Sequence, residues 1–331
     1  MTSVPDAGAE HSGWELFRGD GHQRTVGLPE APPWRRFDGD TDTAEDDDGT
    51  APEARRPHYV IGRDEVEVIN AALHLRRPLL VTGHPGVGKT SLAEAIAHEL
   101  DLGPVLRWPV NSRSTLHDAL YRYDAIGRLQ ESGLRTDKGQ AAPNIGNYVR
   151  LGALGTALVP TDRPRVLLVD ELDKGDVDLP NDLLTVFEEG SFEIPELSRL
   201  PETQRQVDVF TADRDRRVTV SRGFVRCTEF PVVVITSNGE RDFPPAFRRR
   251  CLPLYLADPR EGQLREIIAG HLGPEALADA EGLIQTFLEQ RDLKELATDQ
   301  LLNAVFLRRG GAPLAPDGLL QTVLHQLNPG G

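Results

Sequence analysis

The chain has 331 residues, 39% of them hydrophobic, which is enough for two modest domains or for one domain with additions. Its formal net charge is −15, and residues 1–57 carry −7 of it through 13 acidic residues and 6 arginines. Proteins that hold duplex nucleic acid non-specifically neutralise its phosphates with basic residues. The acidic balance therefore argues against that class, although it leaves room for a local basic pore.

Two cysteines, Cys227 and Cys251, lie far apart without a neighbouring histidine or a CxxC pair. We expect reduced thiols, one of them packed in or beside the core. The first ten residues have neither the basic nor the apolar segment of a signal peptide, and no apolar run approaches the ~20 residues that span a bilayer. We therefore expect a soluble, cytoplasmic protein with no membrane partner.

Residues 1–56 are rich in Pro, Gly, Asp and Glu, and such a segment buries too little apolar surface to offset the entropy of ordering. We predict a disordered acidic tail. Two aromatic patches interrupt it, WELF at residues 14–17 and WRRF at residues 34–37. They are either scattered hydrophobic residues or a short docking element that folds onto this protein or a partner.

Order is expected to begin near Pro57, with a turn and then a helix over residues 64–73 that directs Val66, Ile69 and Leu73 inward. Pro78 begins the first predicted strand. Behind that strand, residues 83–90 read GHPGVGKT, which is the G-x-x-x-x-G-K-[ST] spacing of a phosphate-binding loop.

Each residue type in this loop suits a phosphate. Glycines let backbone N–H groups curl round an anion. Lys89 would meet the β- and γ-phosphates, and the Thr90 hydroxyl can ligate magnesium. The following residues predict a helix with Leu92, Ile96 and Leu100 on one face and a positive N-terminus at the phosphates. A glycine-rich turn that merely fits is the alternative, but the strand–loop–helix setting favours a nucleoside triphosphate site.

Residues 105–110 predict a second strand. Residues 111–160 are mixed, with short helical pieces around 116–123 and 151–158 and an exposed, polar loop over 134–147.

The run RVLLVDE at residues 165–171 predicts a buried parallel strand whose carboxyl end delivers two acids to the ligand edge of the sheet. Asp170 would hold the hydration shell of magnesium, and Glu171 would orient or deprotonate the attacking water. Many strands end in acids, so the run indicates a nucleotide site only in combination with the phosphate loop upstream.

Residues 180–189 predict a helix with Leu183, Leu184 and Phe187 inward. Residues 191–195 and 217–221 alternate like strands around a polar loop and indicate an inserted β-hairpin. Residues 231–238, PVVVITSN, predict another buried strand. Its terminal Asn238 either holds the lytic water opposite Glu171 or only forms the turn with Gly239.

Three arginines at residues 248–250 precede a last strand at 252–256. They are either a solvated surface patch or contain an arginine finger that reaches the γ-phosphate of a neighbouring subunit. From Pro259 on, apolar residues recur at helical spacing over 263–269, 280–288, 298–307 and 318–327, which predicts a small all-helical domain.

Together these motifs resemble the AAA+ ATPases. The strings LLVDELDKGDVDLPNDLLTVFEEGSFEIPE and VVVITSNGERDFPPAFRRRCL resemble the MoxR type in particular. The resemblance implies an α/β P-loop core with a five-stranded parallel sheet between helices, an inserted β-hairpin and a C-terminal helical lid. We predict three regions: the tail at 1–56, the nucleotide-binding core at 57–257 and the lid at 258–331.

The resemblance also assigns roles. Asp170 and Glu171 take the Walker B positions, and Asn238 takes sensor 1. Arg250 takes the place of the arginine finger, with Arg249 as the neighbour that could substitute. The remaining implied residues are those of the Walker A loop and the adenine pocket: Gly83, Pro85, Gly86, Val87, Gly88, Lys89, Thr90, Ser91, Tyr59, Val60, Ile61 and Gly62.

The family implies ATP with Mg²⁺, a homo-oligomeric ring that is most often a hexamer, and chaperone-like remodelling of a partner protein, frequently one with a von Willebrand factor A domain. One departure is visible. The lid of the family usually offers a sensor 2 arginine at the start of its third helix, whereas residues 296–302, LATDQLL, contain none.

Three hypotheses follow from these features. The first is a ring-forming ATPase that remodels a protein, and the second is a nucleotide-dependent regulatory or scaffold module with negligible hydrolysis. The third, a motor on nucleic acid, is disfavoured because residues 192–226 hold seven arginines against six acids, a near balance of charge.

Overall fold

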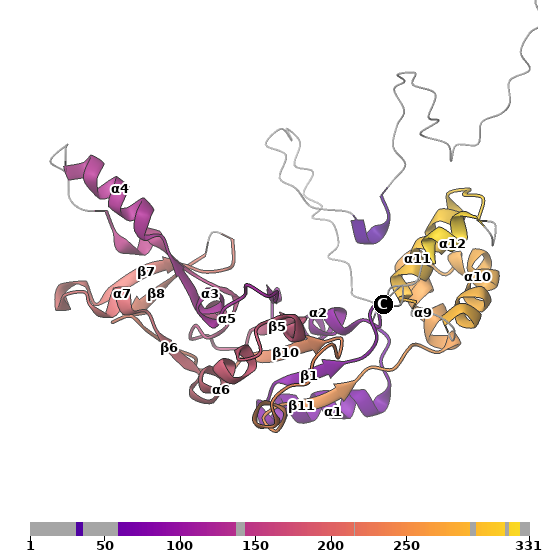
Figure 1. The fold of residues 1–331 in the computed structure, drawn as a ribbon, viewed down its shortest axis with the longest axis horizontal. Coiled ribbons are helices and arrows are strands. Elements are labelled where there is room, and N and C mark those ends of the chain that lie inside the picture. The colour runs from indigo at the N-terminus through magenta and orange to yellow at the C-terminus, as the bar shows by residue number, and fades with distance from the viewer. Residues whose placement is uncertain are drawn as a thin grey trace, which may run out of the picture. The chain divides into compact units, whose positions relative to one another are not determined.

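A computed structural model of the chain describes residues 31–35, 59–136, 143–214, 216–291, 296–314 and 318–324. The chain divides into two compact units, one of Ile61–Asp258 and one of Met1–Val60 with Pro259–Gly331 (Figure 1). Apart from residues 31–35, the predicted tail lies outside the described residues. No helix in the described part of the chain is long and apolar enough to span a membrane.

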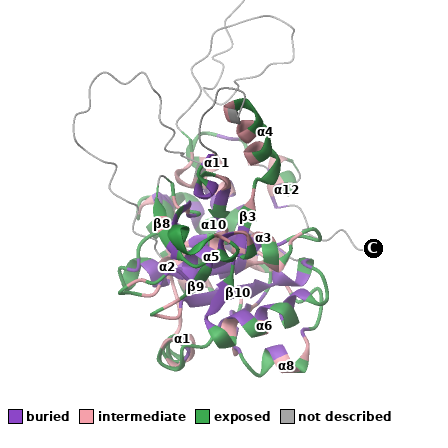
Figure 2. Cartoon of the chain, turned by 90° about the vertical axis from the view of Figure 1, so that its left-hand side faces the viewer, coloured by how far each residue is buried: buried purple, intermediate pink, exposed green. Residues whose placement is uncertain are grey.

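The first sheet of the larger unit, sheet A, has five strands, and all of its pairings are parallel. Parallel strands covered on both faces need continuous apolar runs. The central strand is buried along its whole length (Figure 2). The predicted five-stranded parallel sheet is confirmed, in the order β11 (Leu252–Tyr255), β1 (Leu79–Thr82), β10 (Val232–Ser237), β5 (Val166–Asp170) and β2 (Leu106–Pro109).

Helices flank sheet A. The helix α1 (Arg63–Leu75) contacts β11, and α2 (Lys89–Glu99) contacts β5 and β10. The short helix α5 (Ala153–Ala157) contacts β2 and β5. Two side chains predicted to face inward are exposed. Val66 lies in the first turn of α1, before the buried positions Ile69 and Ala72, and Leu100 is the C-cap of α2. The inward residues of α6 (Leu179–Glu189) are buried or half-buried as predicted.

The second sheet, sheet B, corrects the predicted hairpin. Its hairpin joins β7 and β8, whereas the segment after α6 pairs with β9. The loop predicted between 195 and 217 therefore contains a strand, whose buried Val207 and Val209 alternate with polar residues. The order is β3 (Tyr121–Tyr123), β4 (Val149–Leu151), β7 (Gln206–Phe210), β8 (Arg217–Ser221), β9 (Phe224–Arg226) and β6 (Ser191–Glu193).

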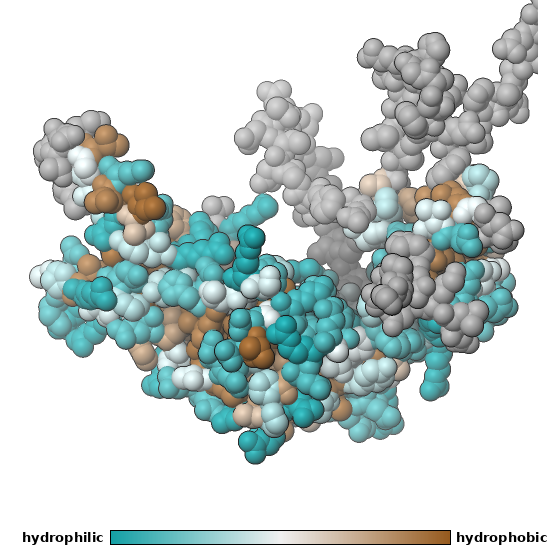
Figure 3. Space-filling model, viewed as in Figure 1, coloured by the Kyte–Doolittle hydropathy of each residue, from teal (hydrophilic) through white to brown (hydrophobic). Residues whose placement is uncertain are grey.

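The region between β2 and β5 also differs from the prediction. Residues 121–123 and 149–151 are strands, so only α3 (Leu116–Leu120) and α5 of the expected helical pieces are helices. The helix α4 (Ala125–Thr136) was not predicted, although Ile126 and Leu129 stand at helical spacing, because its two glycines lower helix propensity; its apolar side chains Ile126, Leu129 and Leu134 are exposed (Figure 3). Ile145, expected in an exposed loop, is buried in a 3-10 turn at Ile145–Tyr148.

One hydrophobic core serves both sheets. Val169 and Ile235 of sheet A belong to the same cluster of buried residues as Val149 and Val207 of sheet B. Cys251 also lies in this cluster, and its burial raises the pKa of the thiol to about 12. Cys251 is therefore a packing residue, as expected for one of the two cysteines.

The second unit is helical, as predicted, and has a core of its own. The turn Pro33–Arg35 belongs to it: the Trp34 indole N–H donates to Asn303 Oδ1 at 3.2 Å, and the ring meets Phe306 edge-on. Trp34 of the aromatic patch at 34–37 thus docks on the chain itself, while Phe37 and the patch at 14–17 lie outside the described residues. The helices are α9 (Glu261–Leu272), α10 (Ala276–Arg291), α11 (Thr298–Arg309) and α12 (Leu319–Val323).

Candidate nucleotide site

The predicted phosphate loop connects β1 to α2 and depends on glycine. At Gly83 a Cβ atom would lie 2.4 Å from the backbone oxygen of Leu256, so no larger residue fits. Gly86 and Gly88 have φ angles of 78° and 96°, in the left-handed region that favours glycine. Gly88 is the N-cap of α2 and offers no side chain to the first N–H groups of that helix. Those N–H groups can therefore serve an anion.

Lys89 is buried at the start of α2, with 7% of its surface exposed. Its Nζ donates to the carbonyl oxygens of Gly83 at 2.7 Å and His84 at 2.9 Å, which holds the amine across the loop. Burial lowers the pKa of Lys89, and the nearby carboxylates of Asp173 and Glu171, followed by that of Asp170, oppose this shift. The loop thus keeps one cation where an incoming phosphate would meet it.

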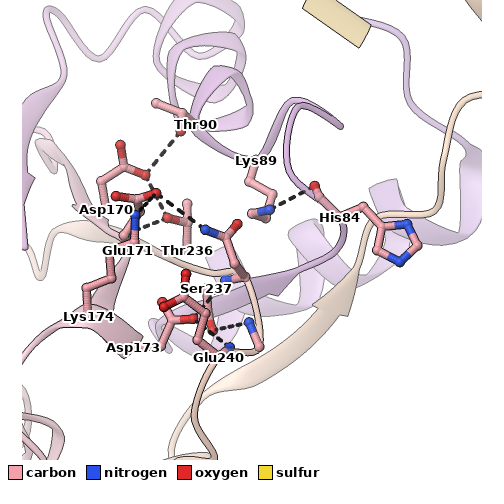
Figure 4. A network of polar contacts seen from close by, with 12 residues as sticks. His84, Lys89, Thr90, Asp170, Glu171, Asp173, Lys174, Thr236, Ser237 and Glu240 are labelled. Atoms are coloured by element: carbon pink, nitrogen blue, oxygen red, sulfur yellow. Dashed lines mark hydrogen bonds and ion pairs between the residues drawn. The ribbon is translucent and has the colours of Figure 1, made fainter. Parts of the chain in front are cut away.

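The carboxyl end of β5 lies beside this loop. The Thr90 hydroxyl donates to Asp170 Oδ1 at 3.1 Å, and the Thr236 hydroxyl of β10 donates to the same oxygen at 2.6 Å (Figure 4). A hydroxyl and a carboxylate are the hard oxygen ligands that Mg²⁺ prefers, usually together with water. Thr90 and Asp170, 80 positions apart in sequence, therefore form a donor set that fits the magnesium implied by the resemblance.

The side chains of Glu171 and Asn238, the two residues predicted to hold a lytic water, are in direct contact. Asn238 Nδ2 donates to Glu171 Oε1 at 3.3 Å, because their strands β5 and β10 are paired neighbours. The turn after β10 is supported instead by Ser237, whose Oγ accepts the N–H of Gly239 at 3.0 Å. The contacts of Asn238 thus go beyond forming a turn.

A second partner of Glu171 was not predicted. Lys174 Nζ lies 2.9 Å from Glu171 Oε1, and this hydrogen bond raises the pKa of Lys174. Glu171 itself has a φ of 59°, a left-handed conformation that is uncommon for a residue with a Cβ, and its N–H donates to the Thr236 hydroxyl at 2.8 Å. Strain of this kind often marks functional sites, where the surroundings hold it in place.

Sequence reasoning missed four further residues of this network. The Thr236 hydroxyl hydrogen-bonds to both Asp170 and Glu171, and Asp173 and Lys174 follow these two residues after Leu172. His84, within the loop, has its Nδ1 2.8 Å from Asp258 Oδ2. Two of these had a visible signal: Thr236 stands in the polar end of an otherwise apolar strand, and Asp173 extends the acidic run.

The predicted arginines lie apart from these acids. Arg249 and Arg250 follow α8 (Pro245–Arg248), and the Arg250 side chain pairs with Glu188 of α6 and donates to Ala246 O at 3.2 Å. Both arginines are exposed. Among the described residues, no contact joins either arginine to the acids at the end of β5.

The four residues predicted for an adenine pocket are half-buried. They fall at the boundary between the units, with Tyr59 and Val60 in one and Ile61 and Gly62 in the other. Gly62 is the N-cap of α1.

The family model of the AAA domain (dynein-related subfamily) matches residues 78–251, more than half of the chain. The chain belongs to this family. Its AAA domain contains the phosphate loop, both strands that carry the polar cluster, and the arginines after α8. The residues at 59–62 and the helices of the second unit lie outside the match.

Two solved structures are similar to this AAA protein. One is a candidate ATPase from Cytophaga hutchinsonii ATCC 33406, with 15% identity and a TM-score of 0.37 over 65% of this chain and 52% of that one. The other is NtrX from Brucella abortus in complex with ATP, with 16% identity and a TM-score of 0.39 over 82% of this chain and 57% of that one. The chain thus spans little more than half the length of either structure. No curated protein matches it.

Proposed function

We propose that this AAA protein binds ATP at the candidate site and hydrolyses it to ADP and inorganic phosphate. The observation that carries the proposal is the contact of Asn238 with Glu171 beside the Thr90–Asp170 pair. The direct bond sets the amide and the carboxylate side by side at the same edge of the sheet as the phosphate loop, where both side chains can bond to one water molecule.

The residues divide the chemistry. Lys89 and the N–H groups of the loop bind the β- and γ-phosphates. Thr90 and Asp170 would hold magnesium, which when bound neutralises phosphate charge. Glu171 accepts the proton of a water as the water oxygen bonds to the γ-phosphorus, while Asn238 orients that water. The bond between the γ-phosphorus and the bridging oxygen breaks, and the electron pair leaves with ADP.

A finer proposal rests on the MoxR resemblance. In it, copies of the chain form a ring, most often a hexamer, and Arg250 completes the site of a neighbour, with Arg249 as its substitute. The exposure of Arg250 and its pairing with Glu188, away from the acids at the end of β5, support this role. The ring would remodel a partner protein, such as one with a von Willebrand factor A domain, in the cytoplasm.

A second candidate is a nucleotide-dependent regulatory module with negligible hydrolysis. The ion pair of Lys174 with Glu171 favours it, because the ammonium occupies a carboxylate oxygen that would otherwise be open to the water. The absence of an arginine from residues 296–302 points in the same direction.

The deciding experiment measures steady-state ATPase rate against protein concentration, with light scattering on the same samples. Wild type is compared with Arg250→Ala and with Arg248→Ala, which removes the same charge from the exposed end of α8. We expect specific activity to rise as the ring forms, and Arg250→Ala to assemble without activity while Arg248→Ala behaves like wild type. Monomers that bind ATP and never turn it over would support the regulatory module instead.

A further inference from the structure

One carboxylate near the candidate site has no part in the chemistry described above. Asp173 lies in the 3-10 turn Leu172–Lys174, directly after β5, and only 3% of its surface is exposed. Aspartate is among the residues that are almost never fully buried without partners. Its burial therefore calls for a specific set of contacts.

Those contacts are two backbone N–H groups of the loop after β10. Asp173 Oδ2 accepts the N–H of Asn238 at 3.0 Å and the N–H of Glu240 at 3.1 Å (Figure 4). Gly239 stands between them with a φ of 79°, a left-handed conformation that lets N–H groups on both sides converge on one anion. The loop after β10 thus holds a carboxylate that follows β5.

The position of Asn238 depends on these two hydrogen bonds. Its side chain reaches Glu171 Oε1 at 3.3 Å, which is longer than the usual 2.9–3.0 Å of an N–H···O bond. A shift of a few tenths of an ångström in the loop would break so long a bond. Asp173, by fixing the Asn238 backbone, holds the amide within reach of the carboxylate that it serves.

We propose that Asp173 is a positioning residue for hydrolysis, which sets the place of Asn238 by accepting two N–H bonds from the loop 238–240. The proposal deepens, and rests on, the proposed ATPase function. The second oxygen of Asp173, Oδ1, has no hydrogen-bond partner among the described residues. The hydrogen bonds of this buried carboxylate are therefore the two that Oδ2 accepts from the loop 238–240. An Asn at this position keeps such an acceptor, whereas an Ala does not.

The kinetic test compares Asp173→Ala, Asp173→Asn and the control Asp242→Ala, which removes an exposed carboxylate just beyond the loop. We expect Asp173→Ala to lower kcat by about 10- to 100-fold, as for other residues that orient a catalytic group, with KM for ATP little changed. Asp173→Asn should recover most of that loss. A kcat for Asp173→Ala equal to that of the control, or a rise in KM alone, would overturn the proposal.

A double-mutant cycle tests whether Asp173 acts through Asn238. If it does, the double variant Asp173→Ala/Asn238→Ala should lose no more activity than Asn238→Ala alone, because without the Asn238 side chain Asp173 has no catalytic group left to position. Losses that multiply would contradict this route. Should Asp173→Ala fail to fold, Asp173→Leu fills the same space without an acceptor and takes its place in both assays.

Hydrogen exchange of the Asn238 and Glu240 amides separates this proposal from the ATPase function itself. Asp173→Ala should expose both amides to exchange, and Asp173→Asn should keep them protected. Unchanged protection in Asp173→Ala overturns the positioning role whatever the activity. A wild type that forms rings and never hydrolyses ATP overturns the ATPase function, while the exchange result still decides whether Asp173 holds the loop.

Discussion

The two sheets of the larger unit contrast in how they are built. The three inner strands of sheet A, β1, β10 and β5, are apolar runs buried on both faces, so each is recognisable in the sequence. Sheet B consists of strands of three to five residues whose polar and apolar positions alternate, and it joins segments from residue 121 to residue 226. The polar cluster of the candidate site lies at the end of sheet A, while sheet B contributes to the shared core.

The two sheets are also tied by an ion pair. Arg165, at the start of β5, donates through both terminal nitrogens to Asp213 in the β7–β8 turn, at 2.9 Å each, and to Pro104 O at 3.1 Å. The comparison therefore predicts that changes at the end of sheet A alter activity, and that changes in sheet B alter stability.

The largest effect is expected for Glu171→Gln. The amide keeps the size of the side chain but cannot accept a proton, so kcat should fall by ~10²–10⁴-fold while ATP still binds. We also expect the variant to accumulate in an assembled, inactive state. Turnover assays with sedimentation in ATP check both points, and hydrolysis at the wild-type rate would show that Glu171 does not activate the water.

Next comes Lys89→Ala, which should abolish productive nucleotide binding. The change removes the cation of the phosphate loop and leaves two carbonyl oxygens without their donor. Charged hydrogen bonds are worth roughly 1.5–3 kcal/mol each, so losing those that the ammonium would make to the phosphates should lower affinity for Mg·ATP by at least ~100-fold in calorimetry. Glu99→Ala, exposed at the end of the same helix, is the control and should bind as wild type.

Asp213→Ala, in the β7–β8 turn of sheet B, should lower the free energy of unfolding without a matching loss of ATPase activity. Arg165 is largely buried and already has one nitrogen, Nε, with no partner among the described residues, so losing the carboxylate should cost ~2–3 kcal/mol at pH 7. Urea unfolding measures the difference. Asp162→Ala, an exposed neighbour in sequence to Arg165, should change stability little.

The same ion pair predicts a pH dependence. The Arg165 guanidinium lowers the pKa of Asp213 below that of the unfolded chain, so the stabilisation is present above the unfolded pKa and is lost as pH falls through the folded one. The difference in unfolding free energy between wild type and Asp213→Ala should therefore shrink below about pH 4. A difference that stays constant down to pH 2 would mean that the ion pair is not its cause.

The smallest effect is expected for Arg217→Ala, at the exposed start of β8. Arg217 lies 3.9 Å from the centroid of the Phe210 ring and donates to Asn147 Oδ1 at 3.0 Å. Exposed contacts of this kind contribute ~0.5–1 kcal/mol. Arg214→Ala, in the adjoining turn, serves as the control in the same unfolding assay, and a loss above that of Asp213→Ala would reverse the expected order.

Local pattern determined much of this protein. The phosphate loop, each apolar run of the inner strands of sheet A and the acids at the end of β5 are each contained in a few consecutive residues, so local spacing alone makes them visible. The helices of the second unit were visible for the same reason, because their buried positions repeat at a regular interval.

Only the tertiary structure decided the rest. The pairing of β6 with β9 depends on hydrogen bonds between distant segments, and the helical spacing of Ile126 and Leu129 in α4 does not reveal that both are exposed. The same holds for the site: Asp170 meets Thr90 and Thr236, and Asp173 meets Asn238, only because parallel strands end at one edge of a sheet. Sequence periodicity records which residues are buried, whereas the partner of each buried polar group is set by the register between strands.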